Sequence, residues 1–286
     1  MAEPRTLRPG DGLYPAALAR AADRPAELRL LGSLGAPAAR VAIVGARDAD
    51  EYGQDVAKAL AAGLARAGVS IVSGGARGID AAAHEGALAA GGHTVAVLGT
   101  GVDRAFPVEH RDLFDRIVSA GGALLSELPD GTRGWPGNFP RRNRIVSGMS
   151  DAVVVVRAGE GSGALITAEW ARSQGVPLFA VPGDVRDDLS VGPIRLLRQG
   201  ARVAASAEDV LAAIGVGAPE ARQLALPALG ARESSLLAAL GRRPRHADEL
   251  ARAAGLDAGT ALAGLLSLEI EGLCEQRPGH YFLRRT

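Results

Sequence analysis

The chain has 286 residues, of which 47% are hydrophobic, 22% charged and 3% aromatic, and its formal net charge is zero. This composition excludes a disordered chain, and a single cysteine excludes a disulfide scaffold, while zero net charge leaves only a local patch for any polyanionic partner. No apolar run approaches the roughly 20 residues of a membrane span and no apolar leader opens the chain, so we expect a cytoplasmic protein without a membrane partner.

Residues 1–37 are rich in proline and alanine, and we expect an N-terminal extension packed on the rest, with one short helix near 15–22. From 38 to 214, short apolar runs alternate with alanine- and leucine-rich helical patterns. The expected strands are 41–44, 69–72, 94–98, 123–125, 152–156 and 178–181, and the expected helices are 50–67, 78–90, 107–120, 138–149, 163–174 and 192–199. This alternation predicts an extended Rossmann-like α/β domain, a doubly wound and mostly parallel sheet.

Residues 215–230 contain glycines and prolines and are expected to form a linker. Residues 231–286 follow with helical patterns at 234–240, 247–254 and 257–272 and a terminal hairpin, which together predict a winged-helix domain. Residues 233–286 contain seven arginines and seven acidic residues, and the third helical pattern contains no arginine or lysine. A reader of the major groove normally carries cations, so a protein-contact or auxiliary role is favoured for this domain.

Ligands of an open parallel sheet bind at the carboxyl ends of its strands, where glycine-rich turns present backbone N–H groups to an anion. Three such strand ends are candidate anion sites, because they carry glycine residues or side chains with hydroxyl or guanidinium groups. The residues of interest are Arg47 after the first strand, Gly74, Gly75, Arg77 and Gly78 after the second, and Ser162 and Thr167 near the start of a later helix. The competing interpretation is ordinary tight turns and helix caps, with Asp80 bonding locally.

A fourth segment, 131–150, contains no acidic residue. It interleaves two aromatic rings with basic side chains: Arg133, Trp135, Phe139, Arg141, Arg142, Asn143 and Arg144. Cations and aromatic faces are what single-stranded nucleic acid requires, for its phosphates and its bases. A solvated basic helix start is the alternative, but arginines at a helix N-terminus oppose the helix dipole, and a bound anion would relieve them.

The sequence offers little for catalysis. It has no C-x-x-C, no histidines at metal-ligand spacing, no G-x-S-x-G and no phosphate loop ending in G-K-[ST]. Glu127 and Glu169 are expected to be surface charges, and His84 a packed or capping histidine. We therefore expect a site that binds rather than reacts, with no catalytic residue, metal or cofactor.

Successive motifs over about 38–205 resemble those of the DprA/Smf family of bacterial DNA-processing proteins. The resemblance is carried by Ser73-Gly-Gly-Ala-Arg-Gly-Ile-Asp80, Leu98-Gly-Thr-Gly-Val-Asp103, Phe139-Pro-Arg-Arg-Asn-Arg-Ile145, Ser162-Gly-Ala-Leu-Ile-Thr-Ala168 and Phe179-Ala-Val-Pro-Gly183. The chain departs from the family pattern at Arg157, where an acid is frequent. The helical N-terminal domain common in the family is absent or reduced to about the first 35 residues.

The resemblance implies non-enzymatic binding of single-stranded DNA, dimerisation through the Rossmann-like domain and loading of a RecA-type recombinase during natural transformation. The motifs of the family and the polar residues singled out above, Asn143, Ser162 and Thr167, together give the expected DNA-binding residues. These are Arg47, Gly74, Gly75, Arg77, Gly78, Phe139, Arg141, Arg142, Asn143, Arg144, Ser162 and Thr167. Phe139 either stacks on a base or is buried. A nucleotide-handling enzyme resembling a phosphoribohydrolase, or a nucleotide sensor, remains the alternative on a similar fold, and dependence on strand length distinguishes them.

Overall fold

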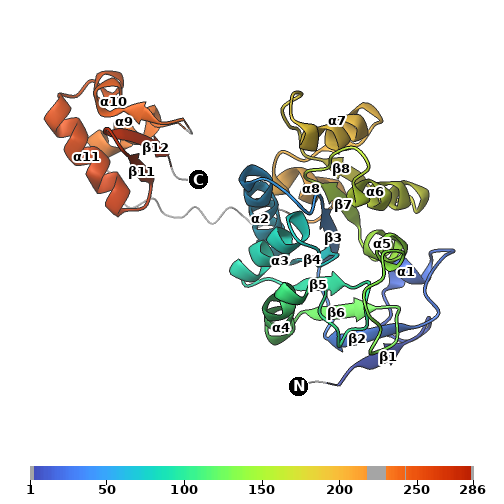
Figure 1. Cartoon of the computed structure of the whole chain (residues 1–286). Helices are drawn as coiled ribbons and strands as arrows, with labels where there is room; N and C mark the ends of the chain where they lie inside the picture. Colours follow the sequence, from blue (N-terminus) through green and yellow to red (C-terminus); the bar gives the residue numbers. More distant parts are fainter. Residues whose placement is uncertain (1–2, 218–229, 242, 285–286) are drawn as a thin grey trace. The chain divides into compact units, whose positions relative to one another are not determined.

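A computed structural model describes residues 3–217, 230–241 and 243–284. The chain forms two compact units, Met1–Glu220 and Ala221–Thr286, and each is described by itself (Figure 1). Within the described residues, no helix is both long and apolar enough to cross a membrane.

The first unit is built on a nine-stranded sheet in the order β1-β2-β6-β5-β4-β3-β7-β8-β9. The strands from β6 to β9 run parallel to their neighbours, while β2 pairs antiparallel with β6 and β1 antiparallel with β2. Their bounds are β1 (Arg5–Leu7), β2 (Leu28–Gly32), β3 (Ala39–Val44), β4 (Val69–Ser73), β5 (Thr94–Val97), β6 (Ala123–Ser126), β7 (Ala152–Val155), β8 (Leu178–Ala180) and β9 (Arg202–Val203). The predicted mostly parallel, Rossmann-like sheet is confirmed.

Helices cover both faces of this sheet (Figure 1). One face carries α1 (Ala16–Ala19), α5 (Asn138–Gly148), α6 (Gly163–Ser173) and α7 (Val191–Arg198), and the other carries α2 (Glu51–Arg66), α3 (Ile79–Ala89), α4 (Arg111–Ser119) and α8 (Ala207–Ile214). Because side chains alternate along a strand, Ala42 and Val44 join the core under the first set, and Val41 and Ile43 join the core under the second. Two short 3₁₀ turns, η1 (Val108–His110) and η2 (Asp188–Ser190), lie in the connections.

The first 37 residues contribute more to the sheet than the sequence indicated. Besides the expected short helix they form β1 and β2, which extend the sheet beyond β6. Leu28 and Leu30 of β2 are buried in the core. Strand β2 is only five residues long, and its sequence Leu28-Arg-Leu-Leu-Gly32 contains an arginine and a glycine, so no continuous apolar run marks it as a strand. Strand β9 and helix α8 were likewise not expected.

The connectivity fixes where a ligand should bind. Starting from β3, the chain adds β4, β5 and β6 on one side and then crosses back to add β7, β8 and β9 on the other. The crevice between β3 and β7 is therefore the point where the strand order reverses, and ligands of doubly wound sheets bind outside the carboxyl ends of the strands at this point.

The second unit contains three helices and a small antiparallel sheet in the order β10-β12-β11. Its elements are α9 (Ala231–Ala239), β10 (Arg245–His246), α10 (Ala247–Ala254), α11 (Ala258–Ile270), β11 (Cys274–Arg277) and β12 (Tyr281–Arg284). Leu236, Leu250, Leu265 and Phe282 form its core. The winged-helix pattern is confirmed. Most of the expected linker 215–230 lies outside the described residues.

Candidate nucleic-acid interface

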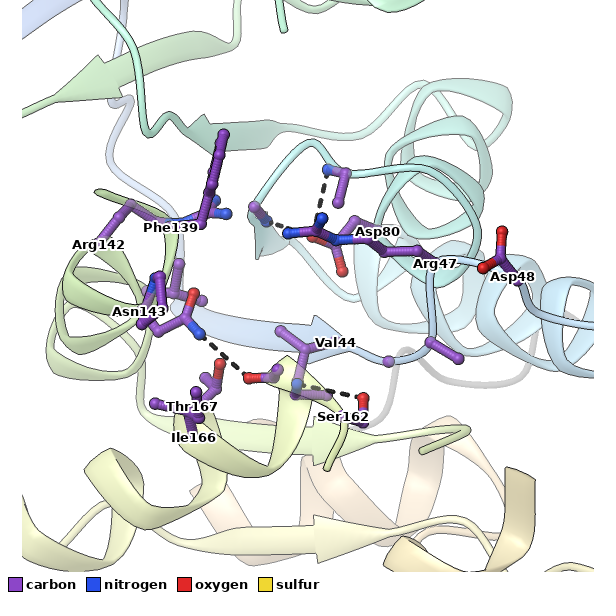
Figure 2. A pocket seen from close by; sticks show the side chains of 18 of the residues that line it. Val44, Arg47, Asp48, Asp80, Phe139, Arg142, Asn143, Ser162, Ile166 and Thr167 are labelled. Carbon is purple, nitrogen blue, oxygen red and sulfur yellow. Dashed lines mark hydrogen bonds between the residues drawn. The ribbon is translucent and has the colours of Figure 1, made fainter. Parts of the chain in front are cut away.

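A cavity of about 630 Å³ opens at the carboxyl edge of the sheet, at the reversal point between β3 and β7. Its walls come from the turns after β3 and β4, the loop leading into α5, and the start of α6. Figure 2 shows α5 side chains on one wall, Arg47 and Asp80 across from them, and the first turns of α6 below. The predicted residues that line it are Arg47, Gly74, Phe139, Arg142, Asn143, Ser162 and Thr167.

Arg142 is the buried cation of this cavity, with 5% of its surface exposed. Its Nη1 donates a hydrogen bond to the carbonyl of Val97, while its Nε has no partner among the described residues. Burial lowers the pKa of Arg142 to about 10, Asp80 opposes this shift, and the nearby charge of Arg47 adds to it. The guanidinium is therefore protonated at neutral pH, and its charge is only partly compensated by its surroundings.

The turn after β4 is closed from within by Asp80. Its buried carboxylate accepts hydrogen bonds from the backbone N–H groups of Gly74 at 3.1 Å and Ala76 at 3.3 Å. Burial raises the pKa of Asp80, and Arg142 and these hydrogen bonds act in the opposite direction. These two N–H groups are therefore already hydrogen-bonded within the protein. Of the two interpretations of this turn, phosphate binding by its amides and local bonding by Asp80, the structure shows local bonding.

The three glycines of this turn have different surroundings. Gly74 lines the cavity, and a Cβ there would overlap the guanidinium of Arg142. Gly75 has φ +70° and lies against the ring of Phe114, outside the cavity lining. Gly78 has φ +72°, and a Cβ there would overlap the carbonyl of Ala46. Gly75 and Gly78 are therefore required by backbone conformation and close packing.

The ring of Phe139 is half-buried and forms part of the cavity wall. The guanidinium carbon of Arg47 lies 5.5 Å from the centroid of this ring. The ring of Phe106 stacks against the ring of Phe139, with centroids 5.2 Å apart and planes inclined by 30°. Gly99 supports the ring from behind, since a Cβ there would come within 2.7 Å of it. No ion pair of Arg47 occurs with any described residue. Phe139 is neither deep in the core nor free in solvent.

Arg144 points away from the cavity and binds Glu127. Its two terminal nitrogens each lie 2.8 Å from a carboxylate oxygen of Glu127, and its Nε donates to the carbonyl of Asp23 at 3.0 Å. The hydrogen bonds with Glu127 raise the pKa of Arg144. Glu127 is only 8% exposed, so the expectation of a surface charge was wrong: Arg141, at 3.2 Å, and Arg144 together compensate its buried carboxylate.

Two further predicted residues lie at the periphery. Arg141 is exposed on α5, and Arg77 is exposed in the turn after β4, where it faces Glu109 at 3.8 Å. Neither lines the cavity. Both guanidinium groups remain accessible to solvent.

The start of α6 supplies the remaining wall. Ser162 is the N-cap and accepts a hydrogen bond from the N–H of Ala164 at 3.4 Å. Asn143 of α5 donates to the carbonyl of Gly163 at 3.1 Å, which joins the two helices at the cavity, and Thr167 lies one turn further on. A helix of this length presents the positive end of its dipole at its N-terminus, so this wall favours an anion.

A second buried arginine, Arg157, was not expected to form an ion-pair network. It contacts Asp50 through Nε at 3.0 Å and Nη2 at 2.6 Å, Ser190 through Nη1 at 2.7 Å, and also Asp187. It lies just after β7, beside the cavity but outside its lining. Asp50 is 107 residues away along the chain, so no local sequence pattern could have indicated this cluster.

The described residues contain no group of three or more histidine, cysteine, aspartate or glutamate side chains arranged to hold a metal. His84 is fully buried, and its Nδ1 contacts the hydroxyl of Thr94 at 2.7 Å. Burial, with the nearby charges of His110 and Arg142, lowers the pKa of His84 to about 3. It is thus a packed neutral histidine, as the sequence indicated.

Fold and cavity together define a Rossmann-like α/β protein with a cavity at the reversal point of its sheet, lined by two arginines, two aspartates and two aromatic rings, and joined to a winged-helix unit. Residues 5–215 match the family model described as DNA recombination-mediator protein A, and residues 218–280 match the DprA winged helix domain. The chain belongs to the DNA recombination-mediator protein A (DprA) family.

Curated relatives agree with this assignment. The Smf protein of Escherichia coli is 37% identical over 296 residues, covering 98% of this chain and 78% of that protein, and the DNA processing protein DprA of Bacillus subtilis is 41% identical over 199 residues, covering 69% and 67%. A DprA protein of Mycobacterium tuberculosis is 43% identical over 251 residues, covering 86% of this chain. The chain spans 64% of the length of that mycobacterial relative.

Two solved structures are also similar. The X-ray structure of DprA from Streptococcus pneumoniae has a TM-score of 0.68 at 38% identity and covers 73% of each chain. A DprA structure from Helicobacter pylori, titled for its single-stranded DNA binding mode, has a TM-score of 0.66 at 29% identity and covers 74% of this chain and 95% of that one.

Proposed function

We propose that this protein binds single-stranded DNA in the cavity between β3 and β7, without catalysing a reaction on it. The observation that carries the proposal is the pairing, in one cavity, of a buried and incompletely compensated guanidinium, Arg142, with the half-buried ring of Phe139 under Arg47. The first offers charge to a phosphate, and the second is an aromatic wall against which a base can pack. The single-stranded DNA binding mode described for the H. pylori DprA structure supports the same class of ligand for this protein.

The remaining polar groups fit this ligand. The start of α6 supplies the hydroxyl groups of Ser162 and Thr167 and the positive end of the helix dipole to the cavity wall. The side-chain amide of Asn143, on α5, lies on the same wall. The exposed Arg77 and Arg141 supply phosphate contacts outside the cavity. In this proposal Arg144, Gly75 and Gly78 act by shaping the site, because their contacts are within the protein.

The proposal extends to the role of the DNA complex. Family membership supports the protein acting, as a homodimer through the Rossmann-like unit, to load a RecA-type recombinase onto single-stranded DNA during natural transformation. A test of this step measures recombinase filament formation on oligonucleotides coated with a single-strand binding protein, with and without this chain. No acceleration of filament formation by the chain would reject the recombinase step while leaving DNA binding intact.

Fluorescence anisotropy with labelled oligo-dT of increasing length tests the binding step. Four guanidinium contacts, from Arg47, Arg77, Arg141 and Arg142, predict that log K falls with log salt at a slope of roughly −3. Arg47→Gln should weaken binding to all sequences alike and flatten the slope by about 0.7. Tight binding of a mononucleotide with no response to oligonucleotide length would reject the proposal and favour a nucleotide enzyme or sensor.

A further inference from the structure

Two exposed aromatic rings, one on the cavity wall and one beyond it, are not among the residues assigned to DNA contacts above. Phe106 is 47% exposed and Trp135 is 69% exposed. A single exposed ring on a protein surface is ordinary. Here, however, Phe106 lines the cavity and stacks on Phe139, which makes it the outer member of a stacked pair that leads from the cavity towards solvent.

Trp135 directly follows, in the chain, a glycine that packs against this pair, and its own ring lies beside Gly137. Gly134 also lines the cavity and packs on the ring of Phe106, at a distance where a Cβ would lie 3.1 Å from the ring. Because consecutive Cα atoms are about 3.8 Å apart, Trp135 and Arg133 both flank this contact. Arg133 is exposed and forms no ion pair with any described residue.

Backbone and side-chain hydrogen bonds tie together the two segments that carry these rings. Gly101 donates to the carbonyl of Thr132 at 3.0 Å, Gly131 donates to the carboxylate of Asp103 at 2.7 Å, and the side chain of Asn138 donates to the carbonyl of Gly99 at 3.3 Å. The rings therefore stand on a connected pair of loops, which lowers the entropy cost of ordering them around a ligand.

We propose that Phe106, on the cavity wall, and Trp135, beyond it, form a second base-stacking subsite, which receives nucleotides that flank the one held at Phe139, with Arg133 as a phosphate contact. The inference rests on the proposed binding of single-stranded DNA and specifies the path of the strand. Aromatic faces accept any base, so this subsite contributes affinity that depends on strand length and not on sequence.

Trp135 itself reports on the proposal, because the chain contains two tryptophans and the other, Trp170, lines a different cavity, among residues of α1 and the last turn of α6. In a Trp170→Phe background, titration with oligo-dT of about six or more nucleotides should quench Trp135 emission at a concentration that matches the anisotropy titration. A mononucleotide, which fills only the cavity, should leave the emission unchanged.

Variants at the ring positions complete the experiment. Phe106→Leu and Trp135→Leu should each weaken the binding of long oligo-dT at least about fivefold, whereas Phe106→Tyr, which keeps a ring, should retain wild-type affinity. Trp135→Leu, which lies outside the cavity lining, should leave mononucleotide binding unchanged. Both rings are exposed, so thermal unfolding of each variant should match the wild type. Unquenched Trp135 and unchanged affinities, with wild-type oligo-dT binding intact, would overturn the subsite alone. Absence of wild-type binding would overturn the proposed function and the subsite together.

Discussion

Arg142 and Arg157 are both buried at the carboxyl edge of the same sheet, yet their surroundings differ in charge. Burial by itself lowers the pKa of Arg157, but hydrogen bonds with Asp50 and Asp187 reverse this and raise it overall, and Ser190 takes a further N–H. Burial lowers the pKa of Arg142 to about 10, and no carboxylate forms an ion pair with it among the described residues.

The comparison separates a structural cation from a ligand-binding one. A buried charge is tolerated when paired and hydrogen-bonded, and it costs free energy when it is not. Arg157 finds its compensation within the protein and ties the start of α2 to the η2 turn. Arg142 lines the cavity and has no ion pair among the described residues, so the charge compensation that it lacks is one that a phosphate in the cavity would supply.

Among the arginines that are paired within the protein, Arg144 should give the largest loss of stability when it is replaced. Arg144 and Glu127 are 10% and 8% exposed, so Arg144→Met leaves a buried carboxylate facing only the exposed Arg141. We expect the free energy of unfolding, measured in urea, to fall by about 3 kcal/mol. Arg141→Met is the matched control and should change it by less than about 1 kcal/mol, because that side chain is exposed. Equal losses for the two variants would contradict this assignment.

Arg157→Met should have a smaller effect of the same kind. Asp50 and Asp187 are 42% and 33% exposed, so both regain water when the guanidinium is removed, and we expect a loss of about 2 kcal/mol. Oligo-dT affinity, measured by anisotropy, should stay within about threefold of the wild type. A large loss of affinity with unchanged stability would place Arg157 in the binding site and remove the distinction from Arg142.

His84 extends the comparison to pH, since the charge of Arg142 helps to keep this histidine neutral. Its pKa in the folded protein is about 3, below the value of 6.5 expected when unfolded, so the unfolded chain binds the proton first. The stability contribution is complete above pH 6.5 and is lost as the pH falls towards 3. At pH 5.5 the loss is about 1.4 kcal/mol.

Urea unfolding at pH 7 and pH 5.5 measures this loss. His84→Met replaces the imidazole with an apolar group of similar size that has no proton to bind, so its stability should change between the two pH values by about 1.2 kcal/mol less than that of the wild type. The same pH dependence in both proteins would show that His84 is not the titrating group.

The sequence indicates the fold well because buried parallel strands are continuous apolar runs, and each glycine turn marks where a strand ends. Strands β3 to β8 and helices α2 to α7 were all expected close to their observed bounds. Strands β1, β2 and β9 were not. They are edge or antiparallel strands of two to five residues, and Arg202 and Val203 of β9 are exposed, so an apolar run could not reveal them.

The site is predicted less completely, because a cluster of basic residues in the sequence does not show in which direction each side chain points. Arg142 and Arg144 are two positions apart on α5 and therefore point to opposite sides of the helix, one to the cavity and the other to Glu127. The basic and aromatic composition of 131–150 identified the segment. Which arginine faces a ligand depends on Glu127 and Asp23, whose proximity only the folded chain establishes.

Arg142→Met, examined for binding and for stability in the same preparation, tests the central distinction most directly. We expect the affinity for oligo-dT to fall about 100-fold, because the phosphate would lose a buried charged donor. The free energy of unfolding should change by no more than about 1 kcal/mol, because the Asp80 carboxylate, whose charge Arg142 also favours, keeps its hydrogen bonds from Gly74 and Ala76. A fall in stability of about 3 kcal/mol with affinity retained would contradict the account, because Arg142 would then be a structural cation like Arg157.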